Sequence, residues 1–222
     1  MTALLSYQTA LLLRSHRWLP PLLLYAAFMF IGVRTGQPIL DSFGYAAAAL
    51  VPVTAWLVRV CVTNEPEAAR DCAAAAAGPW RVHLSAVLTG LLASTVVGVA
   101  ATAVVAAISE PRSSDHQVDV PVGEATAAGL VAVLTCVLLG TAVGALCNRP
   151  LLRSTAWAVP ATVLAAFLVL FAEGSPAEAA VTGMVTGSLD GTVNMGVLPL
   201  AAAAVSAAVA VGVACAVSGR RG

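Results

Sequence analysis

The histidines, cysteines and carboxylates of this chain are the side chains that could do chemistry, and their spacing matches no common catalytic or metal-binding motif. The chain has no HExxH pair for zinc, no GxSxG turn for a serine nucleophile and no phosphate-binding glycine loop with lysine. His83 and His116 each stand alone, and the five cysteines have no metal-ligand spacing. We therefore expect a chain that is not an enzyme and that binds no cofactor directly.

One polar segment, Asn64–Arg81, combines charges of both signs with the signals of a helix. Asn64 is a favourable N-cap residue, and Glu67 three positions later completes a capping box. Glu67 and Arg70 can pair on the surface of such a helix. A run of five alanines favours the helix, and a Gly-Pro pair ends it. The segment predicts a helix over 64–78 that is too short and too charged to cross a membrane.

Six charge-free apolar stretches surround this segment and predict the elements that position it. Hydrophobic residues make up 59% of the chain and charged residues 10%, against about 45–50% and about 25% in a typical globular domain. A helix needs roughly 20 apolar residues to cross a bilayer. We therefore expect an all-α polytopic membrane protein, a single domain with six transmembrane helices. The first two stretches end before Arg34 and Arg59, whose long side chains can reach the interface and extend the spans past them. The predicted spans are 18–36, 42–61, 82–109, 125–147, 154–172 and 195–218.

Two shorter helices are expected outside these spans. Residues 1–17 place Leu4, Tyr7 and Leu11 on one side of a helix and polar side chains on the other, which predicts an interfacial helix along the membrane surface. A Ser-Pro pair followed by an acidic residue signals the start of a second helix, over 175–190. Its apolar part is too short to span, so we expect a re-entrant or surface helix on the outside.

The distribution of arginine predicts the orientation, because the chain has no lysine. If the N-terminus is cytoplasmic, nine of the 11 basic residues fall on the inside, as the positive-inside rule requires. The nine are Arg14, Arg17, Arg59, Arg70, Arg81, Arg149, Arg153, Arg220 and Arg221. Both termini are then cytoplasmic. An alanine-, valine- and arginine-rich composition indicates a GC-rich bacterial genome, hence the bacterial cytoplasmic membrane, and a net charge of zero gives no sign of a nucleic-acid partner.

The spans carry no ionisable residue near their middle, which counts against a proton- or sodium-coupled carrier. Their polar side chains are small hydroxyls that could line a pathway. The candidates are Thr54, Ser94, Thr95, Thr102, Thr155 and Thr162. The alternative for each is a hydrogen bond from the hydroxyl to its own helix.

With these elements assembled, the whole chain resembles the membrane subunit of an ABC transporter of the second exporter type. The resemblance is most specific at Asn64–Arg81, where a charged start precedes an alanine-rich helix and an arginine-containing entry into the next span. In that family the equivalent cytoplasmic helix is the coupling helix, which docks on the ATPase subunit. The resemblance implies that Glu65, Glu67, Arg70 and Asp71 contact the ATPase.

The resemblance also implies the partners. We expect two copies of an ABC ATPase subunit that bind ATP and Mg, a second permease copy or a homologue, and the lipid bilayer. The outside elements before the last span would gate the exit, and the cargo would be amphipathic or hydrophobic, such as a drug, antibiotic, lipid or peptide-like compound. Two alternatives stay open: a passive channel or secondary carrier, and a non-transporting membrane scaffold subunit.

Overall fold

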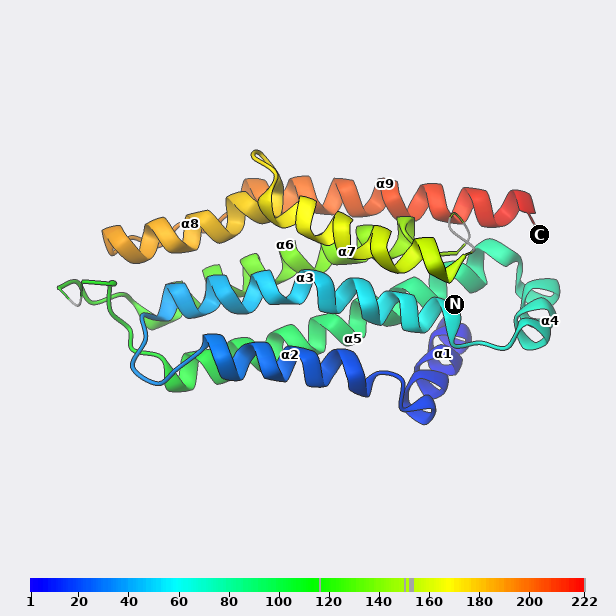
Figure 1. The fold of residues 1–222 in the computed structure, drawn as a ribbon, viewed down its shortest axis with the longest axis horizontal. Helices are drawn as coiled ribbons and strands as arrows, with labels where there is room; N and C mark the ends of the chain where they lie inside the picture. The colour runs from blue at the N-terminus through cyan, green and yellow to red at the C-terminus, as the bar shows by residue number, and fades with distance from the viewer. Residues whose placement is uncertain (116, 150, 152–153, 222) are drawn as a thin grey trace.

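The computed structural model describes residues 1–115, 117–149, 151 and 154–221, and these form nine α-helices. They are α1 (Thr2–Ser15), α2 (Leu19–Gly32), α3 (Ile39–Thr63), α4 (Glu67–Ala77), α5 (Pro79–Ile108), α6 (Val122–Leu146), α7 (Thr155–Phe171), α8 (Pro176–Asp190) and α9 (Val197–Arg221). Most helices run along the long axis of the molecule, whereas α1 and α4 lie at one end (Figure 1). Two residues of the sequence predictions, His116 and Arg153, lie outside the described residues.

Four helices, α3, α5, α6 and α9, are long and apolar enough to cross a membrane, and α7 with α8 makes a fifth candidate if the two count as one span bent by 46°. The all-helical class is confirmed, and these helices have the length and composition of membrane spans. The first predicted span is shorter than expected, because α2 has 14 residues and rises only about 21 Å against a hydrocarbon core of about 30 Å. The six-span topology stays a prediction.

Helix α3 forms the centre of the bundle and packs against α5, α6, α7, α8 and α2. Its contact with α6 is close because two glycines face it. A Cβ atom at Gly140 would lie 2.7 Å from the carbonyl oxygen of Val51, and one at Gly144 would lie 2.7 Å from Cβ of Val58. The two glycines therefore bring two helices of this one chain together.

Helix α1 is separated from α2 by His16, which adopts a left-handed conformation with φ of 54°. The helix packs against α5 and α3. Its two fully buried residues are Gln8 and Leu12, whereas Tyr7 is exposed. The side of α1 that faces the protein is centred on Gln8, which binds a carboxylate there. The predicted apolar face, with Leu4 and Leu11 half-buried and Tyr7 exposed, points elsewhere, and its placement along the membrane surface stays a prediction.

Helix α4 begins later than predicted, and Asn64 is not its N-cap. Helix α3 continues to Thr63, so Asn64 lies at the C-terminal end of α3, and Pro66 occupies the N-cap of α4. Proline disfavours a helical conformation in the residue before it, so the capping box cannot form across Glu65. The predicted end is confirmed, because α4 stops at Gly78, which has φ of 89°.

The second short helix is confirmed as α8. Ser175 is its N-cap, and the Ser175 hydroxyl accepts a hydrogen bond from the backbone N–H of Ala177 at 3.3 Å. In Figure 1, α8 continues from α7 toward the end of the molecule opposite α4, and α9 starts back beside the junction of α7 and α8. The chain therefore runs out along α8 and returns through residues 191–196.

Candidate functional site

Helix α4 is the most isolated element of the described structure. It stands beyond the end of the bundle (Figure 1) and packs mainly against α5, with one hydrogen bond from Arg70 to the end of α3. Glu67, Asp71 and Cys72 are exposed on it, and Arg70 is half-buried toward the bundle. An 11-residue helix of this kind leaves most of its surface open to another molecule.

The linker that leads into α4 is fastened to α1 by two polar contacts. The Asn64 amide nitrogen Nδ2 donates to the carbonyl oxygen of Leu11 at 3.1 Å. The Gln8 amide nitrogen Nε2 donates to Glu65 Oε2 at 3.2 Å. Burial raises the pKa of the Tyr7 phenol, and the nearby Glu65 carboxylate raises it further. Glu65 is therefore turned toward α1 and away from the exposed side of α4.

Arg70 is also turned into the protein. Its Nη1 donates to the carbonyl oxygen of Val62 at 3.4 Å. Burial lowers the pKa of the Arg70 guanidinium, and the carboxylate of Glu65 opposes that shift. Glu67 pairs with Arg149, at 3.0 Å between Oε1 and Nη1, and not with Arg70 as the sequence spacing suggests. Since both partners of this pair are substantially exposed, it contributes about 0–1 kcal/mol.

A polar cleft of about 360 Å³ lies between the start of α4 and the rest of the bundle. Arginines dominate it, and two of them, Arg17 and Arg59, come from the α1–α2 connection and from α3. Arg59 Nη1 donates to Asn148 Oδ1 at 2.7 Å, and the Asn148 amide in turn donates to the carbonyl oxygen of Gly144 at 2.8 Å. Asn148 is almost fully buried, so it holds the Arg59 side chain in place.

An apolar groove of about 340 Å³ runs along α3 between α2 and α7. Leu24, Trp56, Val163 and Phe167 are among its lining residues, and Arg59 lies at its polar end. Thr162 also lines the groove, but its hydroxyl donates to the carbonyl oxygen of Ala158 at 2.7 Å. The groove therefore offers an almost wholly apolar surface.

The other predicted pathway residues are distributed widely. Ser94, Thr95 and Thr102 donate to carbonyl oxygens one turn earlier in α5, so for these the alternative of bonding to their own helix is confirmed. Thr54 is fully buried, and its hydroxyl has no hydrogen-bond partner within the described part of the chain. Thr155 borders the polar cleft. The structure does not gather the six hydroxyls into one cavity.

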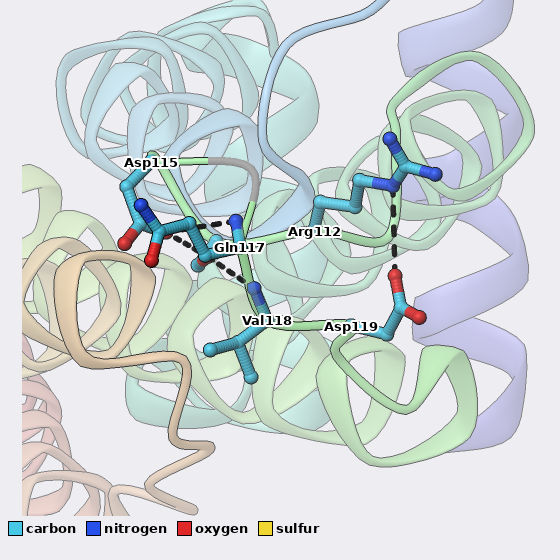
Figure 2. A network of polar contacts seen from close by, with 6 residues as sticks. Arg112, Asp115, Gln117, Val118 and Asp119 are labelled. Carbon is cyan, nitrogen blue, oxygen red and sulfur yellow. Dashed lines mark hydrogen bonds and ion pairs between the residues drawn. The ribbon is translucent and has the colours of Figure 1, made fainter.

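The opposite end of the bundle holds a compact polar loop, residues 109–121. Figure 2 shows the contacts within it: Arg112 Nε lies 3.5 Å from Asp119 Oδ1, and the backbone N–H of Gln117 donates to Asp115 Oδ1 at 3.1 Å. The backbone N–H of Val118 donates to the Ser113 hydroxyl at 3.1 Å. These contacts fold the loop on itself.

The same loop is tied to its neighbours. The Ser114 hydroxyl donates to Asp41 Oδ2 at 3.0 Å at the start of α3 and lies 2.8 Å from the Ser188 hydroxyl of α8. The backbone N–H of Ile39 donates to the carbonyl oxygen of Glu110 at 3.0 Å. Residues from three separate parts of the chain therefore close this end of the bundle.

The remaining side chains that could do chemistry do not meet. His83 is fully buried near the start of α5, and its ring nitrogens have no hydrogen-bond partner among the described residues. Within the described ranges, no three histidines, cysteines or carboxylates are grouped so that they could hold a metal ion. Cys61 and Cys136 are buried, and Cys72 is exposed on α4.

Comparisons with protein-family models, with curated proteins and with solved structures found no match to this chain. The functional assignment therefore depends on the geometry. Its main features are an exposed charged helix at one end, a linker fastened to α1, and a groove that leads from apolar surface to a cleft rich in arginine.

Proposed function

We propose that this chain is the permease subunit of an ATP-driven ABC exporter in the bacterial cytoplasmic membrane. A separate ATPase subunit, in two copies, supplies the energy, and a second permease copy or a homologue completes the pathway. The observation that carries the proposal is α4, an exposed helix with Glu67 and Asp71 on its surface, which packs mainly against α5 and reaches α3 through one hydrogen bond from Arg70. Both termini and α4 belong on the cytoplasmic side.

The attachment of α4 suits the transmission of a push from the ATPase. The helix is joined to α5 through Gly78 and Pro79 with no intervening loop, and its other end is fastened to α1 through Asn64 and Glu65. A helix held at both ends moves with the spans to which it is joined, as rigid-body switching requires. In this arrangement Glu67 and Asp71 contact the ATPase, and Glu65 and Arg70 hold the linker to the bundle.

The groove along α3 is the entry surface for an amphipathic or hydrophobic cargo. Its lining is apolar from Leu24 to Leu170, and a single arginine, Arg59, lies at its end. The polar loop 109–121 and α8 close the opposite end and gate the exit. Alternating access then consists of opening this closed end when ATP binding draws the α4 helices of the two copies together.

The test is co-purification from native membrane in mild detergent. We expect an ATP-binding cassette protein, identified by its nucleotide-binding motif in mass spectrometry, to remain with this chain through two purification steps. Its ATP hydrolysis should change by several-fold when the purified permease chain is added back. Failure to find such a protein, or hydrolysis that the permease chain leaves unchanged, would contradict the proposal and favour a non-transporting scaffold.

A further inference from the structure

The apolar groove and the polar cleft meet at Arg59. This residue lines the groove of about 340 Å³ and the cleft of about 360 Å³. Its bond to Asn148 at 2.7 Å holds the guanidinium at the junction. A molecule that lay in the groove along α3 would therefore place its end beside a fixed positive charge.

The cleft carries more positive than negative charge. Four arginines and two glutamates line it, which leaves an excess of two positive charges. Glu67 pairs with Arg149, and Glu65 Oε2 accepts a hydrogen bond from Gln8, whereas Glu65 Oε1 is buried without a partner among the described residues. Neither Arg17 nor Arg59 has an ion pair within the described ranges. Arg59 is half-buried and Arg17 is exposed beside the cleft. A half-buried cation without a counter-charge favours the binding of an anion.

The tryptophans place this cleft at the level of lipid headgroups. The chain has four tryptophans, and each lies toward the α4 end of its helix. Trp18 precedes α2, Trp80 and Trp157 lie in the first turns of α5 and α7, and Trp56 lies two turns before the end of α3. Tryptophan is enriched where a membrane meets water. The cleft therefore lies at the interface, and the groove extends from it toward the hydrocarbon.

We propose that the groove and the cleft together bind one anionic phospholipid, with its phosphate between Arg17 and Arg59 and an acyl chain along the groove. Arginine binds phosphate oxygens through paired N–H donors. Both cavity volumes lie within the range of about 300–1,000 Å³ that is usual for ligand pockets. The binding of lipid needs no ATPase, so this inference does not depend on the proposed permease function.

The test uses the purified full-length chain in detergent, with lipid binding measured by native mass spectrometry. Short-chain phosphatidylglycerol should bind at least about tenfold more tightly than phosphatidylcholine of the same chain length. Arg59→Gln and, separately, Arg17→Gln should each weaken phosphatidylglycerol about tenfold, the effect of one lost charge-assisted hydrogen bond. The control is Arg81→Gln, because Arg81 lies over Trp80 at 5.2 Å at the same end and does not line the cleft.

A second variant, Val163→Trp, fills the groove without changing any charge and should also weaken binding. Circular dichroism checks that each variant keeps its helix content. Equal affinity for both lipids, or affinity unchanged in both Arg17→Gln and Arg59→Gln, would overturn the inference. The inference would also be overturned if inorganic phosphate displaced phosphatidylglycerol as effectively as unlabelled lipid does, because the groove would then contribute nothing to the affinity. A dimer that Val163→Trp disrupts while lipid affinity stays constant would show that a second copy fills the groove.

Discussion

The two ends of this helical bundle are built in opposite ways. At the α4 end, charged side chains stand on an exposed helix and around a cleft of about 360 Å³. At the other end, the loop 109–121 folds on itself and is bound to the start of α3 and to α8. One end offers surface and charge to other molecules, and the other satisfies its polar groups internally.

Hydrogen bonds to a carboxylate have different structural consequences at the two ends. Glu65 and Asp41 are both carboxylates at ends of α3, and both accept hydrogen bonds from distant parts of the chain. Glu65, however, holds a linker whose continuation, α4, packs mainly against α5. Asp41 holds a loop that is tied on several sides. The same chemistry therefore positions a projecting element at one end and closes the bundle at the other.

The largest expected effect concerns the sides of the membrane on which the two ends lie. Cys72 is exposed on α4, and the side chain of Asp119 is 91% exposed in the opposite loop. One variant keeps Cys72 as its single cysteine, and a second has its single cysteine at position 119, from Asp119→Cys. A membrane-impermeant maleimide should label Cys72 from the cytoplasmic side alone and the cysteine at position 119 from the outside alone. Labelling of both cysteines from the same side would contradict the placement of the two ends on opposite sides of the membrane.

A smaller effect is expected when the fastening of the α4 linker is removed. Gln8→Leu removes the amide that donates to Oε2 of the half-buried Glu65, whose Oε1 already has no partner among the described residues. The loss should cost about 1–3 kcal/mol of unfolding free energy. The measurement is the thermal unfolding midpoint in detergent. The matched control is Gln117→Leu at the other end, where the side chain is exposed and the change should stay within about 0.5 kcal/mol. Equal shifts in the two variants would mean that the contact between Gln8 and Glu65 does not hold the linker.

The smallest effect is expected at the closed end. Ser114→Ala removes the contacts of this hydroxyl with Asp41 and Ser188 and should destabilise the closed loop by about 1 kcal/mol. Hydrogen exchange of the amides in 109–121 should then speed up by about fivefold, with little change at α4. Thr126→Ala, whose hydroxyl bonds only within α6, serves as the control and should leave the loop protected. Unchanged exchange after Ser114→Ala would show that other contacts suffice to close this end.

The local features of both ends could be predicted from the sequence. The helix near Glu67, its stop at Gly78 and the helix start at Ser175 follow from capping, proline and glycine preferences that act over a few residues. The role of Asn64 could not be predicted in this way. The same residue type suits an N-cap and a side chain that reaches another helix, and α1 decided between them by offering the carbonyl oxygen of Leu11.

The contacts that form the candidate site could not be predicted from sequence patterns. Gln8 and Glu65 are 57 residues apart, and Arg59 and Asn148 are 89 apart. No periodicity or spacing links such partners, because their meeting depends on how helices pack. The apolar groove has the same origin, since it exists only where α2 and α7 leave part of α3 uncovered. Pathway hydroxyls chosen by residue type alone were therefore scattered through the fold.

The most direct measurement of the central claim is ATP hydrolysis by a complex of this chain with the proposed ATPase subunit. Asp71→Arg replaces a negative charge by a positive one on the exposed side of α4. Such a reversal costs several kcal/mol where the charges of two partners are complementary. Affinity for the ATPase should fall by about 100-fold, and hydrolysis should return to the rate of the ATPase alone. Glu173→Arg makes the same charge change on an exposed residue outside α4 and should keep the rate of the intact complex. If the two variants behave alike, α4 is not the docking helix.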